Sequence, residues 1–344
     1  MAKKIELKQK LVLEFHRAPG DVLMMTGLVR DLKRTYGERF QIDVRSQFPA
    51  IWRHNPYLTK LSSRDRDVQT INLGGNREDA ADKEGIRWSK AGAKGGAKVH
   101  YATVFHRVFE KRTGLHVPVL EPHGDLHLSP AERANPLIGG RYWIVVPGGK
   151  TDMTTKWYPQ NRWQAVVDRL RPWGLQFVQE GSTKEIHVHP PLTGVLSAVG
   201  QTSVRDIILN IHHAEGIICG CSFPMHIAGA LSKPCVVVFG GREEPWYEWY
   251  SDHYNAFGDQ ASPTKVPHRL LHTLGLLSCC TDRGCWLRRT EKLHDGHADY
   301  DKSLCLKPVR ASDGVTPACM DLISPAHVCE AVMSYYEDGT LPPL

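Results

Sequence analysis

The first third of the chain alternates short apolar runs with one amphipathic segment. Residues 10–15 (KLVLEF) and 41–46 (QIDVRS) carry the closely spaced apolar side chains that are typical of short buried strands. Between them, residues 23–37 place apolar side chains three and four positions apart and end at glycine, which predicts an amphipathic helix. Strand, helix and strand in this order predict a βαβ unit with a parallel sheet. Gly20 and Asp21 then fall at the carboxyl ends of the strands, where such sheets carry their active surface.

The pattern restarts at Arg141 and predicts a second doubly wound α/β domain. Its expected strands and helices alternate through residues 141–149, 161–174, 175–181, 202–214, 216–222, 224–233 and 234–241. The proline-rich passage before it suits a domain connection. We therefore expect a first domain at 1–135 and a second at 136–275, with a ligand cleft between them. A cysteine-rich segment at 276–323 and a terminal helix at 324–344, placed to cross back to the first domain, complete the expected organisation.

Composition narrows the class of protein. At 344 residues, with 23% charged and 41% hydrophobic residues, the chain has the make-up of an ordinary globular protein of two domains. No apolar run is long enough to cross a membrane, and the first fifteen residues lead into a strand rather than a signal peptide, so we expect a cytoplasmic protein. The net charge of +6 favours an acidic partner such as a nucleotide, a nucleic acid or an anionic membrane surface.

Residues 83–100 combine Gly, Ala and Lys without apolar periodicity, which predicts a long loop with a basic tip. One interpretation is a solvated linker. The other is an acceptor-side loop that closes over an acidic substrate, with Lys94 and Lys98 acting together with Gly20.

Six of the nine cysteines lie between Cys279 and Cys329, in a segment poor in apolar residues. Two close thiols and two distant ones fit a tetrahedral site in which a metal replaces a missing core, and zinc and iron both suit thiolates. The predicted ligands of this structural site are Cys280, Cys285, Cys305 and Cys319. Cys279, His294 or His297 could take one position. Free thiols and two disulfides are the other interpretations.

Four segments resemble those of glycosyltransferase family 9. The resemblance covers the chain from Phe15 to about Phe239. The four segments are GDVLMMTGLVRDLKR, VVPGGKTDMTTKWYPQNRW, VVFGGREEPWYEWY and ICGCSFPMHIAGALSKPCVVVFG. The resemblance implies a GT-B fold of two Rossmann-like domains. It also implies that Asp21 is the base that takes the proton of the acceptor hydroxyl. The competing interpretation is that Asp21 only caps the following helix.

The same resemblance implies a site for a nucleotide-sugar donor in the second domain. Lys156 would contact the diphosphate and stabilise the charge that grows on it. Glycines would let backbone N–H groups approach the phosphates or face the nucleotide. These are Gly148, Gly149, Gly240 and Gly241. Glu243 or Glu244 would accept hydrogen bonds from a ribose, unless these glutamates are simply exposed.

The last of these segments retains much of the family pattern and also departs from it. Ser222, Pro224, Met225 and His226 match the family residues, and a helix beginning at Pro224 would point its N–H groups at the donor phosphates. A buried structural role is the alternative for His226. Cys221 replaces an aspartate that in the family is thought to hold hydroxyls of the donor sugar, and Phe223 replaces a glycine. The resemblance therefore leaves the sugar open.

The implied function is that of an inverting glycosyltransferase without a catalytic metal, using an ADP-heptose-like donor. Lipopolysaccharide or another envelope glycan is the default acceptor, and the basic loop suits peripheral association with a membrane. The cysteine-rich segment resembles in kind the iron-binding element of heptosyltransferases that modify autotransporters, which suggests a protein acceptor. A hydroxymethylated base in DNA is a further alternative. An inactive, metal-stabilised nucleic-acid-binding protein is the alternative of another class.

Overall fold

The computed structural model describes residues 9–62, 65, 67–74, 86–88, 94–97, 99–184, 186–250, 266–281 and 283–344, with the backbone alone for 86–88 and 94–97. The chain divides into two compact units. The first holds residues 1–87 and 98–129, and the second holds 88–97 and 130–344. Each unit is described by itself.

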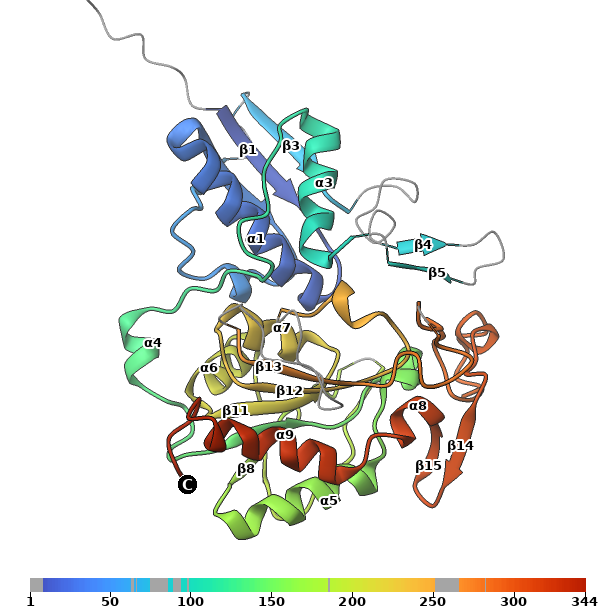
Figure 1. The fold of residues 1–344 in the computed structure, drawn as a ribbon. Helices are drawn as coiled ribbons and strands as arrows, with labels where there is room; N and C mark the ends of the chain where they lie inside the picture. Colours follow the sequence, from blue (N-terminus) through green and yellow to red (C-terminus); the bar gives the residue numbers. More distant parts are fainter. Residues whose placement is uncertain are drawn as a thin grey trace, which may run out of the picture. The chain divides into compact units, whose positions relative to one another are not determined.

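The first unit contains the predicted βαβ unit, which is confirmed. Strands β1 (Gln9–Glu14), β2 (Phe40–Arg45) and β3 (Val68–Asn72) form a parallel sheet in the order β2-β1-β3. Helix α1 (Pro19–Tyr36) connects β1 to β2 and packs against α3 (Tyr101–Thr113), as Figure 1 shows. Proline at the first position of α1 suits the helix start, because its missing N–H would have had no partner there.

The second unit is built on a six-stranded parallel sheet in the order β10-β8-β6-β11-β12-β13. Its strands are β6 (Trp143–Val146), β8 (Phe177–Gln179), β10 (Leu196–Ser197), β11 (Gly216–Gly220), β12 (Cys235–Gly240) and β13 (His268–His272). Numbered along the chain within this unit, the order is 3-2-1-4-5-6, which is the order of a dinucleotide-binding sheet. Strands β6 and β12 are buried along their whole length, as both faces of the sheet are covered.

Helices cover both faces of this sheet (Figure 1). Helices α5 (Gln160–Leu170) and α9 (Pro325–Glu337) pack against each other on one face, and α6 (Val204–His213) contacts α7 (Phe223–Ala230) on the other. Trp163 and Val166 of α5 share a buried core with Val328 and Val332 of α9. The terminal helix is thus part of the core of the second unit, and its predicted return to the first domain stays a prediction.

The remaining elements are short. They are α4 (Pro130–Ala134), α8 (Ala318–Asp321), the antiparallel pairs β7 (Gly149–Lys150) with β9 (His187–Val188) and β14 (Pro308–Ala311) with β15 (Gly314–Pro317), and the 3-10 helices Gly37–Arg39, Pro49–Trp52, Thr151–Lys156, Arg171–Trp173, Pro245–Tyr247 and Tyr300–Lys302. Among the helices of the described residues, none is long and apolar enough to span a bilayer.

The segment expected as a long loop contains two strands. Strands β4 (Ile86–Trp88) and β5 (Lys94–Ala97) form a two-stranded sheet, so the prediction of an irregular loop is wrong for these residues. Backbone hydrogen bonds hold such a pair, and they need no alternation of apolar side chains, which is why the pattern gave no sign of it. Lys94 begins β5, whereas Lys98 lies outside the described residues.

Candidate active site

The strand order of the second unit indicates where a ligand binds. In a sheet of order 3-2-1-4-5-6, the chain turns in opposite directions after the two central strands, here β6 and β11, and ligands bind at the carboxyl ends of those strands. Pro147 and Gly148 follow β6, and Cys221 and Ser222 follow β11. The loop after β6 continues to Lys156, which the sequence predicted as a site residue and which reaches Cys221.

Lys156 lies at the centre of a group of charged side chains. Its Nζ is 2.5 Å from Oε1 of Glu243 and 3.7 Å from Sγ of Cys221. Burial would lower the pKa of this ammonium, but the negative charges around it, those of Glu243 and Glu248 among them, raise it. Lys156 is therefore charged at neutral pH.

Glu243 is almost completely buried, so the interpretation of Glu243 as a simply exposed glutamate is wrong. Burial alone would raise its pKa, yet the charges of Arg242 and Lys156 lower it to about 2. The Arg242 Nη1 donates to Glu243 Oε1 at 2.7 Å, and its guanidinium lies over the ring of Trp286. Glu243 is thus an ionised carboxylate between two cations.

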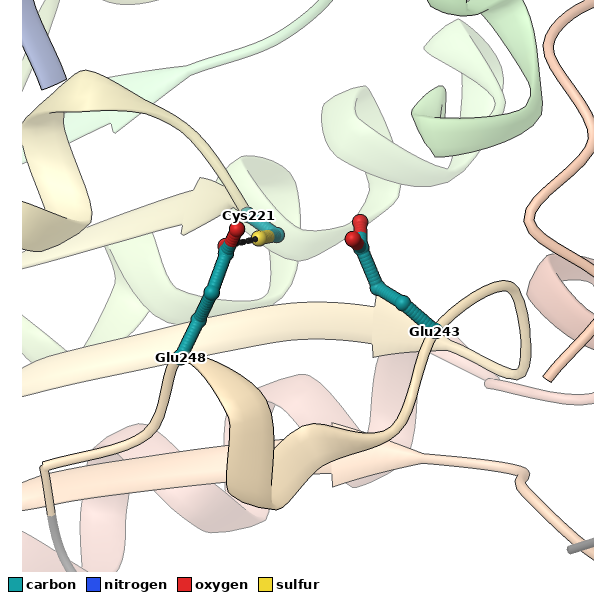
Figure 2. A group of neighbouring side chains, drawn as sticks. All are labelled: Cys221, Glu243 and Glu248. Carbon is teal, nitrogen blue, oxygen red and sulfur yellow. Dashed lines mark hydrogen bonds between the residues drawn. The ribbon is translucent and has the colours of Figure 1, made fainter. Parts of the chain in front are cut away.

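Glu248 is a second carboxylate in this group; it lies in the segment VVFGGREEPWYEWY, but the resemblance gave it no role. It follows the 3-10 helix Pro245–Tyr247, and the thiol of Cys221 donates a hydrogen bond to its Oε2. Figure 2 shows both carboxylates, Glu243 and Glu248, turned toward Cys221. Burial, and then the charge of Glu248, raise the pKa of Cys221 well above its ordinary value, so this residue is a protonated thiol.

These three side chains have the composition of a metal site. One ligand atom each of Cys221, Glu243 and Glu248 lies within 4.8 Å of the others. However, the Lys156 ammonium is already 2.5 Å from Glu243, and it supplies the positive charge that a metal would bring. The arrangement is therefore better described as an ammonium paired with Glu243 beside the hydrogen-bonded Cys221 and Glu248 than as a metal centre.

The predicted helix after Ser222 begins one residue earlier than expected, at Phe223, and Ser222 is its N-cap residue. Met225 has no exposed surface, and its side chain belongs to the core. The ring of His226 is buried and its Nδ1 is hydrogen-bonded to the hydroxyl of Tyr250, which is the arrangement that the structural interpretation of this histidine expected. The N-terminus of α7 itself follows β11 and lies beside Cys221.

The predicted glycines have close neighbours that explain them. Gly148 has a φ of +85°, and an added Cβ would lie 2.2 Å from the carbonyl oxygen of Val188 in β9. A Cβ on Gly240 would lie 2.9 Å from Sδ of Met320, and one on Gly241 would lie 2.7 Å from Sγ of Cys280. Gly149 has a φ of +153° and approaches Trp157. A positive φ favours glycine at positions 148, 149 and 240, and close packing favours it at 148 and 241; their approach to phosphates stays a prediction.

Five of the six cysteines of the tail line one pocket. This small pocket is lined by Cys279, Cys280, Cys285, Cys305 and Cys319, and all nine cysteines of the chain are free thiols, so the two-disulfide interpretation is not what the structure has. Burial, and also the neighbouring cysteines, raise the pKa of Cys280 and Cys305, and that of Cys319 to about 12. Such thiols would lose their protons on binding a metal. His294 and His297 are exposed and do not line the pocket.

The predicted base lies in the first unit. Asp21 is the third residue of α1, whose N-cap residue is Ala18, so Asp21 does not hold the capping position. Gly20 precedes it and is buried. The hydroxyl of Tyr101, from the start of α3, donates a hydrogen bond to Oδ1 of Asp21. Tyr101 was not indicated by any sequence pattern.

Comparison with known proteins decides the family. The family model described as glycosyltransferase family 9 (heptosyltransferase) matches residues 92–272, which is more than half of the chain. The chain belongs to this family. It is therefore a glycosyltransferase, and the matched range contains Lys156, Cys221, Glu243 and Glu248 but not Asp21. No curated protein sequence matches the chain.

Solved structures share the fold of this family 9 enzyme at low sequence identity. The glycosyl transferase family 9 protein from Veillonella parvula DSM 2008 is 14% identical, with 97% of this chain and 99% of that chain covered and a TM-score of 0.61. E. coli ADP-heptose LPS heptosyltransferase II is 15% identical, with 97% and 100% covered and a TM-score of 0.56. The dodecameric iron-containing heptosyltransferase TibC, solved with ADP-D-β-D-heptose, is 14% identical, with 96% and 77% covered and a TM-score of 0.61. TibC is from enterotoxigenic E. coli H10407. These likenesses confirm the predicted GT-B fold.

Proposed function

We propose that this glycosyltransferase moves a sugar, with inversion at the anomeric carbon, from an ADP-heptose-like donor to an acceptor hydroxyl. The observation that carries the proposal is the group of Lys156, Glu243, Glu248 and Cys221 at the point of the sheet where a nucleotide is expected. Two of the similar structures are named as heptosyltransferases, which supports ADP-heptose as the donor to test first.

In the proposed reaction, the carboxylate of Asp21 takes the proton of the acceptor hydroxyl, while the oxygen of that hydroxyl forms a bond to the anomeric carbon. The bond from that carbon to the diphosphate breaks, and the nucleoside diphosphate leaves with the electron pair. Lys156 and the N-terminal N–H groups of α7 would stabilise the charge of the leaving group. Chemistry of this kind needs no metal to act on the diphosphate.

The carboxylates beside Lys156 have a different role in this proposal. A carboxylate repels a diphosphate but accepts hydrogen bonds from hydroxyls. Glu243 is fully buried between two cations, whereas Glu248 is partly exposed next to Cys221. Glu248 is thus the carboxylate suited to hydroxyls of the donor sugar, and Glu243 the one that fixes Lys156.

The acceptor that we propose is a lipopolysaccharide core or another envelope glycan, met in the cytoplasm at the membrane surface. The net charge of +6 suits a phosphorylated acceptor or membrane lipid. Transfer to a protein, or to a hydroxymethylated base in DNA, would be the outcome of an acceptor screen that contradicts this choice.

We also propose that Cys280, Cys285, Cys305 and Cys319 hold a structural zinc or iron ion. These thiols line one pocket, and thiolates suit both metals. The similar TibC is described as iron-containing, which supports iron as the first candidate. Four protein ligands leave no position for substrate, so the ion would support the fold and take no part in transfer.

A thermal-shift screen of ADP, UDP, GDP and CDP tests the donor site. A nucleotide at about a hundred times its dissociation constant stabilises a fold by about 2.7 kcal/mol, so we expect ADP to raise Tm by several degrees. Lys156→Ala should weaken ADP binding about 10- to 100-fold, since it removes a charged hydrogen-bond partner of the diphosphate.

The control is Lys302→Ala, which removes an exposed lysine that pairs with Asp299 at the surface. It should leave the shift with ADP unchanged. Equal binding of ADP by wild type and Lys156→Ala would remove the basis of the proposed donor site, and a shift with another nucleotide alone would replace ADP as the donor nucleotide.

A further inference from the structure

Tyr101 and Asp21 belong to different helices of the first unit, and one hydrogen bond joins them. Asp21 lies in the first turn of α1, and Tyr101 is the first residue of α3. The two helices pack against each other. The phenol hydroxyl of Tyr101 donates to Oδ1 of Asp21. A residue 80 positions away in the chain thus contacts the carboxylate that we propose as the base.

The structure holds Tyr101 in place from two sides. The side chain of His100 accepts a hydrogen bond from the backbone N–H of Ala102 and so fixes the start of α3. The Tyr101 ring lies 5.9 Å from the ring of Phe105, which in turn stands edge-on against Phe15 at 5.2 Å. Only 8% of Tyr101 is exposed. A ring packed in this way has little freedom, and its hydroxyl is the polar end that needs a partner.

Two features of its position suit a carboxylate at Asp21. The positive end of the α1 dipole lies at the first turn, where a carboxylate is stabilised. No side chain caps this helix at Ala18. A phenol that donates to a carboxylate oxygen also stabilises the anion, and it restricts rotation of the carboxylate group.

We propose that Tyr101 is a positioning residue for transfer, which fixes the orientation of the Asp21 carboxylate. The inference rests on the proposed function of Asp21 as the base. A general base must lie within hydrogen-bond reach of the proton that it removes, and a small misplacement of a catalytic group costs a large factor in rate. Tyr101 itself does not touch the reacting atoms in this proposal.

The test measures ADP release from ADP-D-β-D-heptose, with water as acceptor, for Tyr101→Phe, Asp21→Asn and the double variant. Tyr101→Phe should lower kcat about tenfold or more and leave KM for the donor unchanged, because Tyr101 acts only through the base. The double variant should be no slower than Asp21→Asn alone, since residues that act as a unit are not additive. Tyr36→Phe is the matched control, because the Tyr36 hydroxyl donates only to the His116 carbonyl oxygen in the same unit.

Two results separate the failure of this inference from that of the proposed function. If Tyr101→Phe stays within about twofold of wild type while Asp21→Asn loses turnover, Tyr101 has no positioning role but the base stands. If Asp21→Asn keeps full turnover, the base itself is wrong. Thermal unfolding of wild type, Tyr101→Phe, Asp21→Asn and the double variant tests the contact between Tyr101 and Asp21 without any substrate. If the decreases in Tm of the single variants add in the double variant, the inference is overturned. If they do not add, it is supported.

Discussion

At the scale of single residues, the site is a balance of buried charges. Lys156 was predicted from the sequence because it stands in a lysine-tryptophan-tyrosine-proline context. Its partners could not be fully predicted, because Glu243, Glu248 and Cys221 come together only when two strands lie side by side. Cys221 had been recognised as a departure from the family pattern. The carboxylate that contacts it, Glu248, is 27 residues further along the chain, in the segment VVFGGREEPWYEWY, where only Glu243 and Glu244 had been considered.

Glu243 gives a prediction about pH. Its pKa is about 2 in the folded protein against 4.5 for an ordinary glutamate, so its ionised form stabilises the fold. A group with a depressed pKa contributes this stability above the ordinary value and loses it as the pH falls toward the folded value. Glu243→Gln should therefore lower Tm at pH 7. The difference in Tm between this variant and wild type should shrink as the pH is lowered from 4.5 to about 2.

Thermal unfolding across this pH range checks the prediction. Glu337→Gln is the control, because Glu337 is exposed near the end of α9 and should show no such trend. If the difference in Tm between Glu243→Gln and wild type stayed constant down to pH 2, this would contradict the stabilisation of ionised Glu243 by Lys156 and Arg242.

At the scale of elements, the cysteine-rich segment is joined to the proposed donor site. The Thr155 hydroxyl, next to Lys156, donates to the carbonyl oxygens of Leu287 and Arg288 at 2.6 and 2.9 Å. The Arg242 Nε donates to the Leu287 carbonyl oxygen at 2.7 Å. The chain that follows Cys285 thus supports both loops of the site. Cysteine spacing predicted that these thiols gather, but nothing in the sequence indicated what the segment packs against.

This arrangement predicts the effect of removing one thiol. Purified protein kept under reducing conditions should contain about one zinc or iron ion per chain. The Cys305→Ser variant should contain less than half an equivalent of metal per chain. It should also have a lower Tm and bind ADP more weakly, because the segment that accepts hydrogen bonds from Thr155 and Arg242 loosens. Metal analysis with calorimetric titration of ADP measures all three effects.

Cys329→Ser is the control for this variant. Cys329 lies in α9 and its thiol donates to the Val166 carbonyl oxygen, away from the pocket. It should keep both the metal and the affinity for ADP. A wild type with less than about half an equivalent of metal would remove the four-thiolate site.

At the scale of the whole molecule, the α/β pattern was easier to predict than the details. Apolar periodicity predicted four of the six strands of the second unit's sheet and its main helices, because strands buried on both faces carry continuous apolar runs, but it did not predict β10 or β13. It missed the pair β4 and β5, whose residues carry no such pattern. The family could be recognised from short motifs even though the similar structures share only 14 to 15% identity with this chain. The contacts of Asp21 and of Lys156 required the fold.

The most direct test of the account is the stereochemistry of donor hydrolysis. Proton NMR can follow the sugar released from ADP-D-β-D-heptose and record the anomer that forms first. We expect the α-anomer, with a rate about 10² to 10⁴ times lower in Asp21→Asn, because an inverting enzyme with a carboxylate base attacks from the opposite face of the sugar. First formation of the β-anomer, or an unchanged rate in Asp21→Asn, would contradict inversion with Asp21 as the base.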